Sequence, residues 1–126
     1  MKILLDTHIL LWWLDDNPAL SESFRTLIRD PENTVFISAV TLWEIWLKQS
    51  IGKLKLPPRF NDLLALEAFE NLALTARQTA AVAELPWHHR DPFDRMLVAQ
   101  AQVERLTLLS IDQDLAAYGD FVFCGK

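Results

Sequence analysis

Apolar and polar residues are arranged along the chain in two different periods, and these periods predict its secondary structure. Short apolar runs rich in β-branched and aromatic residues predict strands at 2–5, 34–37, 71–74, 107–110 and 121–123. Apolar residues that recur every three or four positions predict helices at 7–15, 21–29, 39–49, 61–69, 75–85, 113–118 and from Pro92 onward. Strands and helices therefore alternate along most of the chain.

This order of elements predicts the fold class. Strands that alternate with helices favour a parallel sheet covered on both faces, so we expect an α/β fold of three layers, an α/β/α sandwich. Its central sheet should be mainly parallel and contain four to five short strands. The 126 residues, of which 51% are hydrophobic, suit one packed core. No repeat, low-complexity segment or linker divides the chain, and we expect a single domain over residues 1–126.

Four carboxylates occur where predicted strands give way to helices. Asp6 follows the first strand, and Asp112 follows the strand at 107–110. Glu44 falls in the second turn of the helix after the second strand, and Asp94 in the first turn of its own helix. Sites in open α/β sheets lie beyond the carboxyl ends of the strands, so all four acids are expected at one edge of the sheet.

Four like charges at one edge would repel one another unless a cation lay between them. Carboxylate oxygens are the ligands of Mg²⁺ or Mn²⁺, and no histidine or cysteine has a spacing typical of zinc. The chemistry that matches such a site is phosphodiester hydrolysis, in which the metal activates water and neutralises charge on the phosphate. The pattern leaves open whether one or two metal ions bind.

Each acid also has a structural explanation at a helix start. Asp6 and Asp112 could cap the helices that follow them, and residues 41–44 fit a capping box that ends at Glu44. Asp91 directly precedes Pro92, which is typical of an N-cap, so we assign Asp91 mainly to structure. Asp114 is an alternative to Asp112 as the fourth acid. The conjunction of all four acids favours a site over four separate caps.

The segments around these acids resemble those of the PIN-domain ribonucleases, and most closely those of the VapC-type toxins of type II toxin–antitoxin systems. The similar segments appear in the family's order and are LLDTHILLW at 4–12, SAVTLWEI at 38–45, HRDPFDRML at 89–97 with AQA at 99–101, and LSID at 109–112. The last segment has serine where threonine is common in the family. The resemblance extends over nearly the whole chain.

By this resemblance Asp6, Glu44, Asp94 and Asp112 are the catalytic, metal-binding acids. It implies further that hydroxyls near the metal or its water support them, and these belong to Thr7, Ser38 and Ser110. The family adds an RNA substrate, for which tRNA or another structured RNA is open, cut to leave 5′-phosphate and 3′-hydroxyl ends. It also adds a cognate VapB-type antitoxin and a toxin homodimer. Composition and spacing indicate none of these partners.

The net charge of −5 does not by itself favour a nucleic-acid partner. Basic residues nevertheless gather in two places, between 45 and 60 and around the two aspartates at 91 and 94. We expect the RNA backbone to be contacted by Lys48, Arg90 and Arg95. The apolar N-terminus lacks the cleavage pattern of a signal peptide, and no apolar stretch is long enough to span a bilayer. Cys124 is the one cysteine, so an intrachain disulfide is excluded. We therefore expect a cytoplasmic protein that does not associate with a membrane.

Two other functions remain open on these residues. One is a PIN nuclease that processes RNA in a housekeeping role. The other is a non-enzymatic α/β/α interaction or phospho-receiver module, although the first strand lacks paired acids and no lysine occurs between Lys55 and Lys126. The tryptophans at 12, 13, 43, 46 and 87 are explained either by core packing or by a dimer interface or antitoxin groove. The RNA target and the antitoxin's binding mode do not follow from the sequence.

Overall fold

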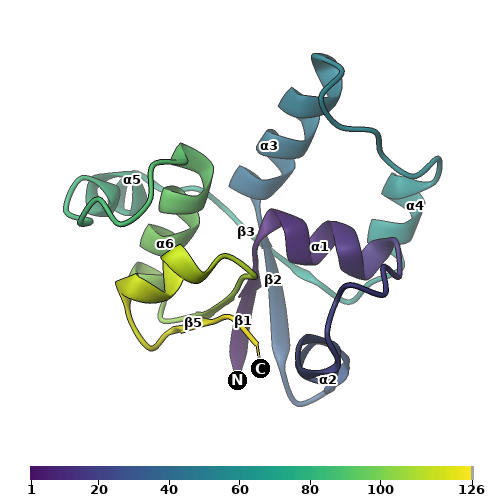
Figure 1. Ribbon diagram of the computed structural model, residues 1–126, viewed down its shortest axis with the longest axis horizontal. Helices are drawn as coiled ribbons and strands as arrows, with labels where there is room; N and C mark the ends of the chain where they lie inside the picture. Colours follow the sequence, from purple (N-terminus) through teal and green to yellow (C-terminus); the bar gives the residue numbers. More distant parts are fainter. Residues whose placement is uncertain (126) are drawn as a thin grey trace.

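A five-stranded parallel sheet forms the centre of the molecule, with strand order β3-β2-β1-β4-β5 (Figure 1). This computed structural model describes residues 1–125. The strands are β1 (Lys2–Leu5), β2 (Thr34–Ser38), β3 (Glu70–Leu72), β4 (Thr107–Leu109) and β5 (Val122–Phe123). Leu4 of β1 pairs with Phe36 on one side and with Leu108 on the other. The direction of the strand order changes at β1, where α/β proteins form their ligand crevice.

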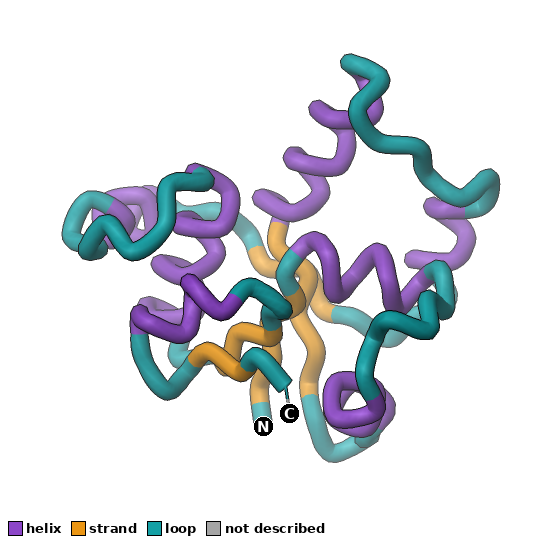
Figure 2. Tube along the Cα trace, in the orientation of Figure 1, coloured by secondary structure: helices purple, strands orange, loops and turns teal. Residues whose placement is uncertain are grey.

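Helices follow the strands and cover both faces of the sheet (Figures 1 and 2). They are α1 (Thr7–Leu14), α2 (Glu22–Arg29), α3 (Ala39–Ser50), α4 (Phe60–Ala65), α5 (Ala76–Val82), α6 (Pro92–Glu104) and a 3₁₀ helix, η1 (Gln113–Tyr118). Helices α1, α2 and α4 lie on one side of the central strands, and α5, α6 and η1 lie on the other. The expected three-layer α/β/α architecture is confirmed.

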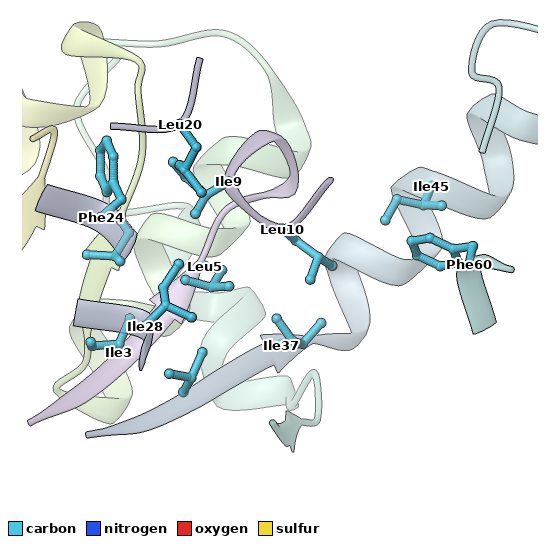
Figure 3. Packing of buried hydrophobic residues seen from close by; sticks show 12 residues of the cluster. Ile3, Leu5, Ile9, Leu10, Leu20, Phe24, Ile28, Ile37, Ile45 and Phe60 are labelled. Carbon is cyan, nitrogen blue, oxygen red and sulfur yellow. The ribbon is translucent and has the colours of Figure 1, made fainter. Parts of the chain in front are cut away.

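The side chains of β1 divide the apolar core into two clusters. Ile3 and Leu5 point to the cluster that contains α1 and α2, where Ile9 and Leu10 pack against them (Figure 3). Leu4 points to the opposite face and packs in the cluster that contains α5, α6 and η1. A central strand that is covered on both faces must be apolar at successive positions, which explains the unbroken run after Lys2.

Two predicted helices end earlier than their sequence pattern indicates. Helix α4 ends at Ala65 instead of 69, and α5 ends at Val82 although Pro86 is the first residue that cannot continue it. Residues 83–85 instead form tight turns, whose N–H groups donate to carbonyls three residues back. The capping box that opens α5 is confirmed, because the side chains of Thr75 and Gln78 each accept from the other residue's backbone N–H.

None of the helices within residues 1–125 combines the length and the apolar composition that a membrane span would need.

Candidate acidic active site

Asp6 lies at the end of β1, at the point where the strand order changes direction. Its side chain caps α1 by accepting a 2.9 Å hydrogen bond from the N–H of Ile9, as expected for an acid at this position. Its own N–H donates to the carbonyl of Leu109 in the neighbouring strand β4, which is followed by Ser110. Asp6 is 4% exposed, so the carboxyl group is almost completely removed from water.

Asp94 enters the same edge of the sheet from the first turn of α6. Asp91 caps this helix by accepting a 2.9 Å hydrogen bond from the N–H of Asp94, with Pro92 at the first helical position. The structural role expected for Asp91 is therefore confirmed. Because Asp91 caps α6, the Asp94 carboxylate is not needed for capping and is available to the site.

Asp112 caps η1, and the hydroxyl of Ser110 orients it. Its Oδ1 accepts from the N–H of Asp114 at 2.9 Å, while its own N–H donates to Ser110 Oγ at 3.1 Å. Asp114, the alternative fourth acid, has a side chain that is 72% exposed, compared with 36% for Asp112. Asp112 is therefore the acid that lies closer to the buried part of the cluster.

A histidine that the sequence analysis did not select joins these acids. His89 Nε2 lies 2.9 Å from Asp94 Oδ2 and 3.4 Å from Asp112 Oδ2. His89 Nδ1 lies 4.0 Å from Asp114 Oδ2. The two carboxylates, which are 18 residues apart in the chain, thus meet at one imidazole nitrogen. The sequence signals were the position of His89 at the start of the HRDPFDRML segment and in the basic cluster around Asp91 and Asp94.

Glu44 completes the acidic edge from the second turn of α3. It does not belong to the capping box expected at 41–44, because α3 begins at Ala39 and the Ser38 hydroxyl accepts from the N–H of Val40. Glu44 is buried, and Thr7 Oγ1 donates to its Oε1 at 2.5 Å. Lys48, one helical turn later, donates to Oε2 at 2.6 Å.

The pKa values of two carboxyls at this edge are raised, mainly by burial and also by neighbouring negative charges. Burial raises the pKa of Asp6 to about 6; the Ser110 hydroxyl and the Ile9 N–H oppose this rise, and the charge of Asp94 adds to it. Burial also raises the pKa of Asp94, the hydrogen bond to His89 lowers it, and the charges of Asp91 and Glu44 raise it again. Negative charges that are partly removed from water accumulate here.

The donor set fits a hard divalent cation. Burial and the charge of Asp94 disfavour the ionisation of Asp6, and ligand atoms of His89, Asp112 and Asp114 all lie within 4.8 Å of one another, so negative charge gathers at this edge. Mg²⁺ or Mn²⁺ would relieve both effects, since these ions prefer oxygen ligands. His89 adds one nitrogen to the same place.

Two residues of the predicted site make contacts with the fold. The Ser38 hydroxyl, expected to support the metal, donates to Gln100 Oε1 at 2.6 Å inside the core. Arg95 is only 5% exposed, and its guanidinium donates to the carbonyls of Pro86 and Val82 and to the Tyr118 hydroxyl. These contacts, and not an RNA backbone, account for the donors of Arg95 in this structure.

The other predicted basic residues have different settings. Arg90 is exposed, and Lys48 is partly exposed and paired with Glu44. Arg95 also stacks on the ring of Trp87, with its Cζ 3.8 Å from the ring centroid. The Arg95 guanidinium also donates to the His89 carbonyl at 3.4 Å, so it binds the segment that carries His89.

The PIN domain family matches residues 3–120, a stretch that contains every acid described above. The chain belongs to the PIN domain family. PIN domains are typically nucleases and generally use a divalent metal ion, which places this chain among the hydrolases. The alternative of a phospho-receiver module finds no support in this family.

Several solved structures share the PIN fold over nearly their whole length. The chain is similar to VapBC2 from Rickettsia felis bound to a promoter DNA fragment, with a TM-score of 0.70, 20% identity, and 98% of this chain and 96% of that chain covered. It is also similar to FitAcB from Neisseria gonorrhoeae, with a TM-score of 0.67, 22% identity and 96% of each chain covered. A toxin–antitoxin complex from Klebsiella pneumoniae gives a TM-score of 0.64 at 19% identity, covering 96% and 95% of the two chains. No curated protein matches the chain significantly.

Proposed function

We propose that this PIN domain is a metal-dependent endoribonuclease and the toxin of a VapC-type toxin–antitoxin pair. The observation that carries the proposal is the convergence of Asp94 and Asp112 on one nitrogen atom of His89, beside the buried Asp6. Capping alone would not require acids from separate elements to meet. An RNA phosphodiester bond is the substrate that such a hydrolase would cut.

The acids at the end of the sheet would hold Mg²⁺ or Mn²⁺. When bound, the ion lowers the pKa of a water molecule and neutralises charge on the phosphate. The chain itself orients the carboxylates: Asp6 Oδ1 and Asp112 Oδ1 each accept from a backbone N–H, and Asp94 Oδ2 meets His89 Nε2. Because these oxygens are held in place before a ligand binds, the site is preorganised, which favours catalysis.

An antitoxin partner is supported by two solved structures of similar fold, VapBC2 from Rickettsia felis and a toxin–antitoxin complex from Klebsiella pneumoniae. We infer that a VapB-type antitoxin binds the apolar side of α3, where Trp43 is 58% and Trp46 40% exposed. Trp12 and Trp13, in contrast, pack against the core. A toxin homodimer and a cytoplasmic location complete the proposal.

The first prediction tests the chemistry with Asp94→Asn. Asparagine keeps the shape of the side chain but removes a charged metal ligand, so we expect RNA cleavage to fall by at least about 100-fold. Purified protein would be incubated with labelled RNA in Mg²⁺ or Mn²⁺, and chelation by excess EDTA should abolish cleavage in the same way.

The matched control is Asp120→Asn. Asp120 is an exposed acid just before β5, at the opposite, amino-terminal edge of the parallel sheet. Its variant should cut RNA at the wild-type rate. Full activity of Asp94→Asn, or of the wild-type protein in EDTA, would contradict the proposed mechanism.

A further inference from the structure

Glu44 differs from the other acids at this edge because the protein itself satisfies both of its oxygens. Thr7 donates to Oε1 at 2.5 Å, and Lys48 donates to Oε2 at 2.6 Å. The side chain of Glu44 is 7% exposed, so little water reaches it. The carboxylate is thus held between a hydroxyl and an ammonium group.

The other acids lack a comparable partner. Within residues 1–125, the ion pairs of Asp94 and Asp112 are with His89, and Asp6 has no ion pair with a lysine or arginine. Their carboxylates also accept hydrogen bonds from neutral groups, as Asp6 does from Ile9 and Asp112 from Asp114. Asp6, Asp94 and Asp112 therefore remain the acids in need of a cation.

The position of Lys48 suits a fixed positive charge at the rim of the site. It lies four residues after Glu44 on α3, so both side chains are on one face of the helix. The Lys48 side chain is 42% exposed, compared with 7% for Glu44, so Lys48 is the member of the pair that solvent and ligands can reach.

We propose that Lys48 takes the place of a second metal ion. This inference rests on the proposed function and decides between one and two ions at its site. One divalent cation binds with Asp6, Asp94 and Asp112, while the Glu44–Lys48 pair presents the second positive charge to the RNA phosphate. In two-metal sites, a second ion stabilises the leaving oxygen. Here the Lys48 ammonium, which donates to Glu44 Oε2 at 2.6 Å, would supply that positive charge.

The test counts metal ions with no RNA present. Isothermal titration of Mn²⁺ into the wild-type protein should give one site. Lys48→Met removes the charge and frees Glu44, so we expect a second Mn²⁺ site to appear. Lys48→Arg keeps the charge and should remain at one site. Lys53→Met, which removes an exposed lysine just beyond α3, is the matched control and should also remain at one.

The outcomes separate this inference from the proposed function. Two Mn²⁺ sites in the wild type, or a single unchanged site in Lys48→Met, would overturn the role of Lys48 while leaving a metal nuclease intact. No Mn²⁺ binding by the wild type at all would overturn both. Thermal unfolding of each variant shows that it is folded, and Thr7→Val, which removes the other donor to Glu44, should still bind one ion because Lys48 remains.

Discussion

At the scale of single residues, Asp112 combines a helix cap with a contact inside the acidic cluster. Its Oδ1 accepts from the N–H of Asp114 at the start of η1, as Asp6 Oδ1 does from Ile9 at the start of α1. Its Oδ2 meets His89, where Oδ2 of Asp94, which caps no helix, also lies. Capping and a role in the site were alternatives on the sequence, but the two oxygens of Asp112 make one contact each.

His89 gives a prediction about the metal-free protein. Replacing it in His89→Ala removes a hydrogen bond to Asp94 in a cluster of like charges, so the free energy of unfolding should fall by about 1 kcal/mol. Urea unfolding in EDTA measures this loss. In saturating Mn²⁺ the difference from the wild type should shrink, because the ion then compensates the carboxylates.

The neighbouring histidine provides the control for this measurement. His88 is exposed and packs edge-on against Tyr118, with ring centroids 5.0 Å apart. The difference between His88→Ala and the wild type should be the same with and without Mn²⁺. A His89→Ala deficit that is equally large in both conditions would show that His89 only supports the fold.

At the scale of elements, the sequence predicts the starts of helices better than their ends. Helix starts carry local signals: Asp91 before Pro92 predicts the start of α6, and Thr75 with Gln78 predicts the start of α5, and the structure confirms both. The end of α5 depends on a residue of the next helix: Arg95, 13 residues after Val82, donates to the carbonyls of Val82 and Leu85. Such a tertiary contact leaves no local pattern.

The same limit applies to the site. The edge of the sheet shared by the acids follows from the order of strands and helices, so the sequence could predict their neighbourhood. It could not predict that Ser38 would turn toward Gln100, or that His89 would lie between two acids, because both contacts depend on how α6 packs against the sheet. Nor does the sequence predict that Arg95 is buried, because arginine is seldom found inside a protein.

Arg95 gives a prediction at this scale. Arg95→Met removes donors from several carbonyls of the segment between α5 and α6, so the free energy of unfolding should fall by about 3 kcal/mol. Hydrogen exchange in residues 83–91 should speed up more than in β1. Arg77→Met, a change at an exposed arginine of α5, should leave both quantities close to wild type. Unchanged exchange in 83–91 would contradict the anchoring role.

At the scale of the whole molecule, an acidic protein that cuts RNA must bring its own carboxylates close to the negative phosphates of the RNA. The net charge is −5, and the acids of the site lie at one edge of the sheet. The metal ion and Lys48 would provide the positive charge that the overall composition lacks. If so, net charge is a poor guide to the partner, because binding depends on the local field, which a few charged groups set.

The exposed apolar side of α3 gives a prediction about assembly. Trp46 packs against Phe60 of α4 and remains 40% exposed. If an antitoxin helix covers this side, Trp46→Ala should weaken its binding by roughly 30-fold, equivalent to about 2 kcal/mol at an interface aromatic. Leu74→Ala changes a side chain that is 41% exposed outside α3 and should leave the affinity unchanged. Equal affinity of Trp46→Ala and the wild type would place the antitoxin elsewhere.

The measurement that tests the central claim most directly is the sequencing of RNA ends from cells after induced expression. Wild-type protein and Asp94→Asn would be compared at equal abundance. We expect new 5′-phosphate ends at defined positions with the wild type, together with arrested growth, and neither effect with Asp94→Asn. The same new ends in both strains, or none in either while the wild type still arrests growth, would contradict a nuclease built on this acidic cluster.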